Sequence, residues 1–115
     1  MKLVTRKIAN QFRKHPFRSQ RRKGENAKVL AKYFDPYGTG TWLITEAQQM
    51  YDGDWLMYGH FKEYGEWSWG YVKLSELGHL NDGCCYEVER DLYIPEISTV
   101  AELKRMRCGQ YVSVQ

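Results

Sequence analysis

Residues 33–45 have the pattern of two short strands joined by a tight turn. Pro36 presets the backbone angle of the second turn position, Asp35 can cap the turn, and Gly38 follows. Apolar residues crowd both flanks of this turn. The pattern predicts a β-hairpin, so the rest of the chain is expected to extend an antiparallel sheet.

The segment that leads into this hairpin, residues 27–35, alternates apolar and basic residues. This two-residue period predicts a half-buried strand. Val29, Ala31 and Tyr33 are expected on its buried side, and Lys32 on its solvent side.

Short strands separated by brief turns are expected along most of the chain. They are predicted at residues 41–45, 55–61, 67–72 and 85–94, with a tail strand at 111–114. Such a succession is typical of an antiparallel meander. At 115 residues the chain is long enough for one domain with its own core.

Helices are predicted at both ends of this sheet. Thr5 can cap a helix that runs to about Lys14, with an apolar stripe at Val4, Ile8 and Phe12. One helical turn is expected at residues 74–77, closed by Gly78. A capping box at residues 99–102 predicts a last helix, with Val100, Leu103 and Met106 on its apolar side, that stops at Gly109.

The predicted fold is therefore α+β, a single small domain with a curved antiparallel sheet of about five strands and a helix at each end. It divides into a basic N-terminal helix and arm (1–26), the sheet core (27–94) and a C-terminal helix and tail (95–115).

Charge is distributed very unevenly along the chain. Residues 1–34 contain eleven Lys and Arg and one acid, whereas residues 35–115 contain six basic and thirteen acidic residues. This division predicts a basic arm that favours polyanions on an acidic body. The expected nucleic-acid contacts are Arg13, Lys14, Arg18, Arg21, Arg22 and Lys23. The alternative is a solvated loop that keeps the protein soluble, and in either case residues 17–23 are expected to be mobile when unbound.

Four acidic residues flank the third predicted strand. Asp52 and Asp54 precede it, and Glu63 and Glu66 follow it. They are candidates for a patch that binds a partner protein, or they simply keep the turns solvated.

Twelve of the seventeen aromatic residues lie between residues 33 and 71. They can fill the core of a small sheet or form an exposed platform on which bases stack. Such platforms combine rings with basic side chains, and Lys62 is the one basic residue in this stretch. The core is therefore the favoured interpretation.

Glu87, Glu89 and Asp91 alternate along the fifth predicted strand. Three carboxylates on one face could hold a magnesium ion, so a metal-dependent nuclease or phosphoesterase is the alternative function. The favoured interpretation is a solvent-exposed face with Val88 and Leu92 turned inward, because no Lys or His base is identifiable beside the acids.

No catalytic residue, metal or cofactor is predicted. Cys84, Cys85 and Cys108 are an odd number and are expected to be reduced thiols. The three histidines stand far apart in sequence, so a zinc site is not expected. Without a membrane span or signal peptide in the pattern, the expected location is the cytoplasm.

Three separated motifs carry a family resemblance. They are Lys32-Tyr33-Phe34-Asp35-Pro36-Tyr37-Gly38 with Thr41-Trp42, Gly70-Tyr71-Val72-Lys73-Leu74-Ser75-Glu76-Leu77, and Val88-Glu89-Arg90-Asp91-Leu92-Tyr93. In this order they resemble the signatures of the domain of unknown function 2958, over about residues 27–94. The resemblance implies a small protein of plasmids, conjugative elements or phages. It implies no activity, and the basic segment before the first strand and the helix after Tyr93 depart from the usual pattern.

Charge and family resemblance together favour a non-enzymatic interaction protein of a phage or plasmid. It is expected to act on host defence or on nucleoprotein complexes that handle DNA, as an inhibitor or accessory factor. The basic arm would contact DNA or RNA, and the acidic body would contact a host protein. A structural or assembly protein of a particle is a further alternative. No membrane partner is expected, and the oligomeric state is left open.

Overall fold

The computed structural model describes residues 2–36, 38, 40–79, 88–94 and 98–105. The elements follow the chain as α1 (Arg6–Lys14), the 3-10 helix η1 (Arg21–Asn26), β1 (Ala31–Phe34), β2 (Thr41–Gln49), β3 (Trp55–Glu63), β4 (Glu66–Lys73), α2 (Leu74–His79), β5 (Glu89–Arg90) and α3 (Val100–Lys104). No helix in these ranges is long and apolar enough to cross a membrane.

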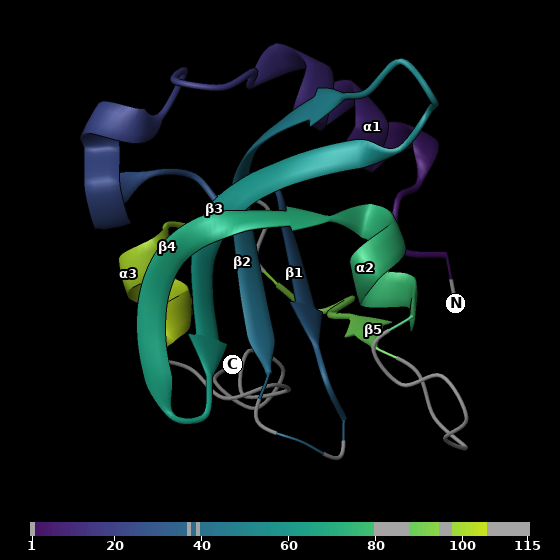
Figure 1. The fold of residues 1–115 in the computed structure, drawn as a ribbon. Helices are drawn as coiled ribbons and strands as arrows, with labels where there is room; N and C mark the ends of the chain where they lie inside the picture. Colours follow the sequence, from purple (N-terminus) through teal and green to yellow (C-terminus); the bar gives the residue numbers. More distant parts are fainter. Residues whose placement is uncertain (1, 37, 39, 80–87, 95–97, 106–115) are drawn as a thin grey trace.

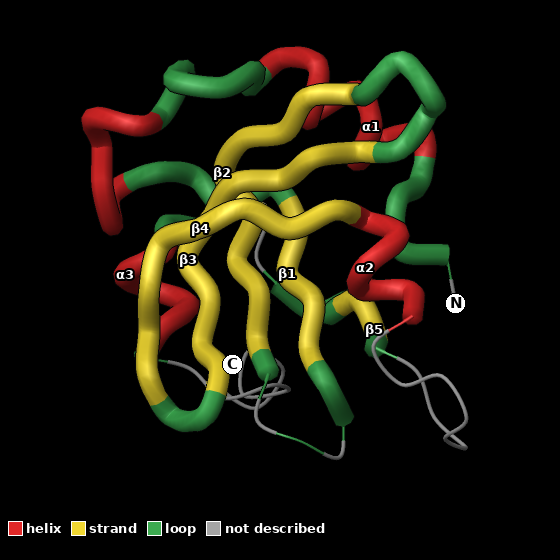
Figure 2. Tube along the Cα trace, viewed as in Figure 1, coloured by secondary structure: helices red, strands yellow, loops and turns green. Residues whose placement is uncertain are grey.

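The strands form one antiparallel sheet in the order β4-β3-β2-β1-β5 (Figure 1). The three long strands β2, β3 and β4 bend markedly (Figure 2). The predicted α+β class is confirmed, and the antiparallel meander is confirmed for β1 to β4. β5 departs from the meander, because it pairs with β1 and not with β4. The predicted residues 85–87 of the fifth strand, the helix end at Gly109, the tail strand and the three cysteines lie outside the described residues.

Helix caps explain where the two terminal helices begin. The Thr5 hydroxyl accepts a hydrogen bond from the amide of Ile8 at 3.2 Å, as predicted for the N-cap of α1. Thr99 and Glu102 form the predicted capping box of α3. Both helices therefore start where local sequence alone places them.

Apolar residues pack on both faces of the sheet. On the first, which we call the α1 face, Ile8 and Phe12 of α1 join Trp42, Trp55 and other buried residues in the main core. On the opposite face, which we call the α3 face, Val100 and Leu103 of α3 pack on Val29 and Leu43. The N-terminal helix is thus part of the folded core and covers the sheet.

Coverage of both faces corrects the expectation for Lys32. Its side chain is 2% exposed, and its ammonium lies 3.4 Å from the carboxylate of Asp91, which is also 2% exposed. The two-residue alternation assumed that one face of β1 meets water. The prediction for Leu92 is also wrong, because Leu92 is 55% exposed while Asp91 points inward.

Candidate functional site

A β-bulge in β2 decides which side chains of this strand lie on the α3 face. The register with β3 shifts between Ile44 and Glu46, so that Glu46 lies opposite Tyr58. Regular alternation would place Glu46 on the same side as Ile44, in the main core. The extra residue turns the Glu46 carboxylate to the α3 face, where it is fully buried.

The buried Glu46 carboxylate holds the basic segment that follows α1. It accepts hydrogen bonds from the amide of Arg18 at 2.8 Å, from the amide of Gln20 at 3.0 Å and from the Arg21 guanidinium at 2.8 Å. Arg18 adopts a positive φ of 76°, in the left-handed region. Residues 18–21 are therefore fixed to β2 by three bonds to one side chain.

The same segment covers a part of β2 that β1 does not reach. β1 pairs with residues 41–44 only, and beyond them the amide of Ala47 donates to the carbonyl of His15 at 3.1 Å. The buried Gln20 side chain donates to the carbonyls of Lys28 and Thr45 at 2.9 and 2.7 Å. These bonds satisfy backbone groups that an uncovered strand edge would leave exposed.

Six rings form a continuous series beside this segment, which we call the ring row. It runs Phe17, Tyr71, Tyr58, Trp69, His60 and Trp67, with successive ring centroids 5.5, 5.0, 5.7, 4.4 and 5.1 Å apart. Trp69 is 38% and Tyr71 54% exposed. The expectation that the rings fill the core holds for Tyr33, Trp42, Trp55 and Phe61. It fails for Trp69 and Tyr71, and also for Tyr51 and Tyr64, which are exposed outside the row.

Two cations from distant parts of the chain contact the ring row. The Arg21 guanidinium carbon lies 3.7 Å from the ring centroid of Tyr58. The hydrogen bond between Arg21 and Glu46 raises the pKa of the guanidinium above its ordinary value. The Lys104 ammonium of α3 lies 5.3 Å from the ring of Trp67 and 3.2 Å from the carboxylate of Glu25. The row therefore combines rings with positive charge.

His60 is the buried member of the ring row. Burial, together with the nearby Lys104, lowers its pKa. Its Nε2 lies 3.2 Å from the Lys104 ammonium, which has only protons to donate, so Nε2 acts as the acceptor. A neutral His60 thus helps to position Lys104 over the row.

The predicted nucleic-acid contacts divide into two groups. Arg18, Arg22 and Lys23 are exposed on the segment beside the ring row, where Arg21 lies over Tyr58. Arg13 and Lys14 lie in the last turn of α1, and Arg13 lies over the ring of Trp55 at 5.7 Å. Of the basic residues from 18 to 23, Arg21 therefore contacts the rings and the other three lie on the same segment, whereas Arg13 and Lys14 belong to the covering helix.

The four acidic residues proposed for protein binding lie at opposite ends of β3. Asp52 and Asp54 precede the strand, and Glu63 faces Glu66 across the β3–β4 turn at its other end. A hydrogen bond from Ser75 lowers the pKa of Asp54, and that carboxylate ties the β2–β3 turn to α2. These residues do not form a single patch.

The three acidic residues of the fifth predicted strand do not lie in one common environment either. Glu87 lies outside the described residues, Glu89 is half-buried in β5, and Asp91 contacts Lys32. Within the described ranges no three His, Cys, Asp or Glu side chains group as a metal ion would require.

Sequence reasoning missed Glu46, Gln20 and Lys104 as residues that build this surface. An available signal was the single carboxylate that follows the apolar residues 42–44, in a chain whose preceding segment is basic. The position of Lys104 has no comparable local signal, because α3 meets η1 through a contact between residues far apart in sequence.

A search of the curated proteins and a search of the solved structures found no match. A family model described as "Protein of unknown function (DUF2958)" matches residues 3–107. The match extends well beyond the three motifs, into the basic segment and α3. The chain therefore belongs to the DUF2958 family.

Proposed function

We propose that this protein binds single-stranded nucleic acid without catalysing a reaction, with bases stacked on the ring row and phosphates on the basic residues beside it. The observation that carries this function is the position of Arg21 and Lys104 over two half-buried rings of the row, Tyr58 and Trp67, next to the exposed rings of Trp69 and Tyr71. Proteins that bind single strands combine such rings with cations that follow the backbone.

The exposed rings suit unpaired bases better than duplex DNA. Trp69 and Tyr71 present ring surface on a strand, and bases in a duplex already stack on one another. Arg18, Arg22 and Lys23 are exposed on the neighbouring segment, at positions suited to phosphate contacts. Because Glu46 fixes this segment, little chain ordering is required on binding.

The biological setting that we propose is a plasmid, conjugative element or phage, in which the protein acts on host defence or DNA handling. Strand exchange and replication of such elements expose single strands. A host protein as second partner remains part of this proposal, but the separated acidic residues at the two ends of β3 do not define its binding surface.

Replacing Trp69 or Tyr71 by alanine is expected to weaken binding of a labelled oligothymidylate by roughly ten- to a hundredfold, because each stacked base contributes about 1–3 kcal/mol. Tyr51→Ala and Tyr64→Ala are matched controls, since both tyrosines are exposed outside the ring row. Fluorescence anisotropy measures the affinity, and urea unfolding verifies that each variant is folded. Equal loss in the control variants, or equal affinity for duplex, would contradict base stacking on the row.

Replacing Arg18, Arg22 and Lys23 together by glutamine is expected to reduce the slope of log K against log salt by about 2, since each phosphate contact on a single strand contributes about 0.7. Lys73→Gln is the control, because Lys73 is exposed at the end of β4. The affinity is measured from about 50 to 200 mM salt. Binding that is independent of salt in the unmodified protein would rule out the phosphate contacts.

A further inference from the structure

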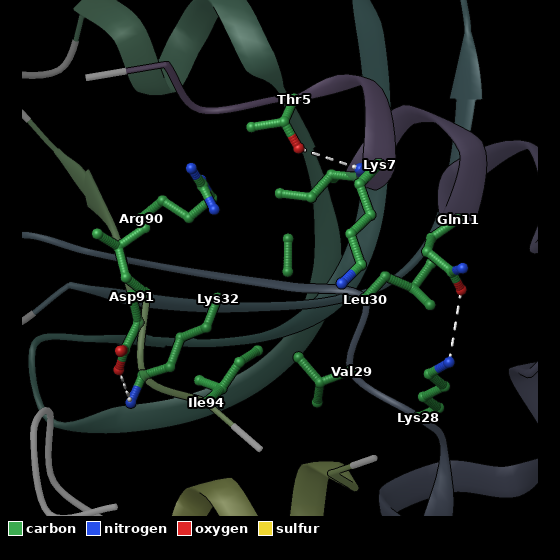
Figure 3. Close-up of a pocket in the computed structure, with 13 residues that line it drawn as sticks. Thr5, Lys7, Gln11, Lys28, Val29, Leu30, Lys32, Arg90, Asp91 and Ile94 are labelled. Atoms are coloured by element: carbon green, nitrogen blue, oxygen red, sulfur yellow. Dashed lines mark hydrogen bonds and ion pairs between the residues drawn. The ribbon is translucent and has the colours of Figure 1, made fainter. Parts of the chain in front are cut away.

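A pocket of about 280 Å³ lies between α1, the chain entering β1 and the residues of β5 and beyond (Figure 3). It contains none of the ring-row residues and none of the arginines or lysines predicted to bind nucleic acid. Its wall is half-apolar, with Val29, Leu30 and Ile94 among its lining residues. It is therefore a second, separate feature of the molecule.

Basic residues predominate among the described residues of the pocket wall. Four basic side chains and one acidic side chain belong to them. Asp91 is the acidic one, and Lys32 already neutralises it at 3.4 Å. The other basic residues of the wall are Lys7, Lys28 and Arg90, and Arg90 also has interactions of its own.

These three cations come from three different segments and are held in place differently. Arg90 donates from Nε to the carbonyl of Lys2 at 3.3 Å, and Lys28 contacts the Gln11 side chain at 3.4 Å. In Figure 3 the Lys7 side chain reaches from α1 toward the chain at Leu30, and the Arg90 guanidinium turns toward Thr5. Positive charge thus enters the pocket from opposite walls.

We propose that this pocket binds a phosphate monoester. Such a group carries close to two negative charges at neutral pH and three acceptor oxygens, which match several cations from different directions. A carboxylate carries one charge and two acceptor oxygens, and so matches several cations less well. The apolar part of the wall then contacts the organic group attached to the phosphate, and the volume approaches that of small-molecule sites.

Two kinds of ligand carry a phosphate monoester of this type: a free mononucleotide and the terminal phosphate of a nucleic-acid strand. The test uses adenosine monophosphate as the probe, adenosine as the uncharged comparison, and isothermal calorimetry as the measurement. Adenosine monophosphate is expected to bind and adenosine is not. Lys7→Gln is expected to weaken binding about tenfold or more, because it removes a charge-assisted contact.

Lys14→Gln is the matched control, since Lys14 lies on the same helix, is exposed and does not line the pocket. A second variant, Arg90→Gln, is expected to weaken binding from the opposite wall. Absence of binding by adenosine monophosphate at millimolar concentration, or equal effects of Lys7→Gln and Lys14→Gln, would overturn the assignment.

A pair of oligonucleotides of one sequence, with a 5′-phosphate or a 5′-hydroxyl, distinguishes the two sources. Tighter binding of the phosphorylated strand that disappears in Lys7→Gln assigns the pocket to strand ends. Equal binding of the two strands, with adenosine monophosphate still bound, assigns it to free nucleotides. The ring row is tested by Trp69→Ala with the 5′-hydroxyl strand and the pocket by Lys7→Gln with adenosine monophosphate, so failure of the ring-row function and failure of the pocket are separable.

Discussion

Replacing Lys32 by methionine is expected to lower the free energy of unfolding by about 3–5 kcal/mol, because it leaves the Asp91 carboxylate buried without its cation. Both side chains are 2% exposed, and their charged atoms lie 3.4 Å apart. Small domains are stable by about 5–15 kcal/mol in total, so this loss is a large part of the stability. Urea unfolding followed by tryptophan fluorescence measures it.

The same pair offers an internal control through a double variant. Lys32→Met combined with Asp91→Leu removes both charges and is expected to recover much of the loss, because an apolar pair avoids the desolvation of two ions. Lys14→Met, on the surface of α1, is expected to change stability little. If the double variant is as unstable as the sum of the two single variants, the charges are not energetically coupled and the ion pair does not explain the burial of Lys32.

Local signals in the sequence were sufficient for the order and type of the main elements. Thr5 and Thr99 begin helices through hydrogen bonds within one turn, and turn residues such as Asp52 and Gly53 mark where strands reverse. The antiparallel order of β1 to β4 follows, because strands joined by short turns pair with their neighbours, whereas the pairing of β5 with β1 does not. These features depend on residues within a few positions of one another.

The outcome for Lys32 shows where such reasoning stops. Alternation in β1 correctly separated Ala31 and Tyr33 from Lys32, but it could not reveal that α3 and the residues after β5 cover the second face. Burial of a lysine requires a partner, and Asp91 is far away in sequence. The prediction failed because it concerned packing between distant segments.

The ring row was missed for a related reason. The stretch from residue 33 to 71 contains one basic residue, which favoured a buried core. The cations that contact the rings, Arg21 and Lys104, lie on either side of this stretch in sequence. Charge and rings meet only once the sheet bends and η1 and α3 pack together.

The role of Glu46 also could not be predicted from local sequence, because a one-residue bulge decides which face of the sheet its carboxylate lies on. Replacing Glu46 by alanine is expected to lower the free energy of unfolding by about 3 kcal/mol or more. Two amides, of Arg18 and Gln20, lose their acceptor, and each buried unsatisfied donor costs about 1–3 kcal/mol. Arg21 loses its ion pair as well.

A comparison with Arg21→Met separates the contribution of the ion pair from that of the backbone bonds. The Arg21 side chain is 32% exposed whereas Glu46 is fully buried, and in this variant the carboxylate keeps both amide donors. A smaller loss of stability is therefore expected than for Glu46→Ala. The arginine itself contributes chiefly through its contact with Tyr58, so its removal is expected to affect strand binding more than unfolding.

Binding measurements on the Glu46 variant connect the fold to the proposed function. If the bonds from residues 18–21 hold the basic segment beside the ring row, Glu46→Ala weakens strand binding under conditions in which the variant is still folded, although the mutated side chain faces no ligand. Binding of adenosine monophosphate to the pocket beside α1 is expected to change less, because Glu46 hydrogen-bonds no lining residue directly and is connected to Lys28 of the wall only through Gln20. A folded Glu46→Ala protein with full affinity for single strands would show that the placement of residues 18–21 is irrelevant to binding.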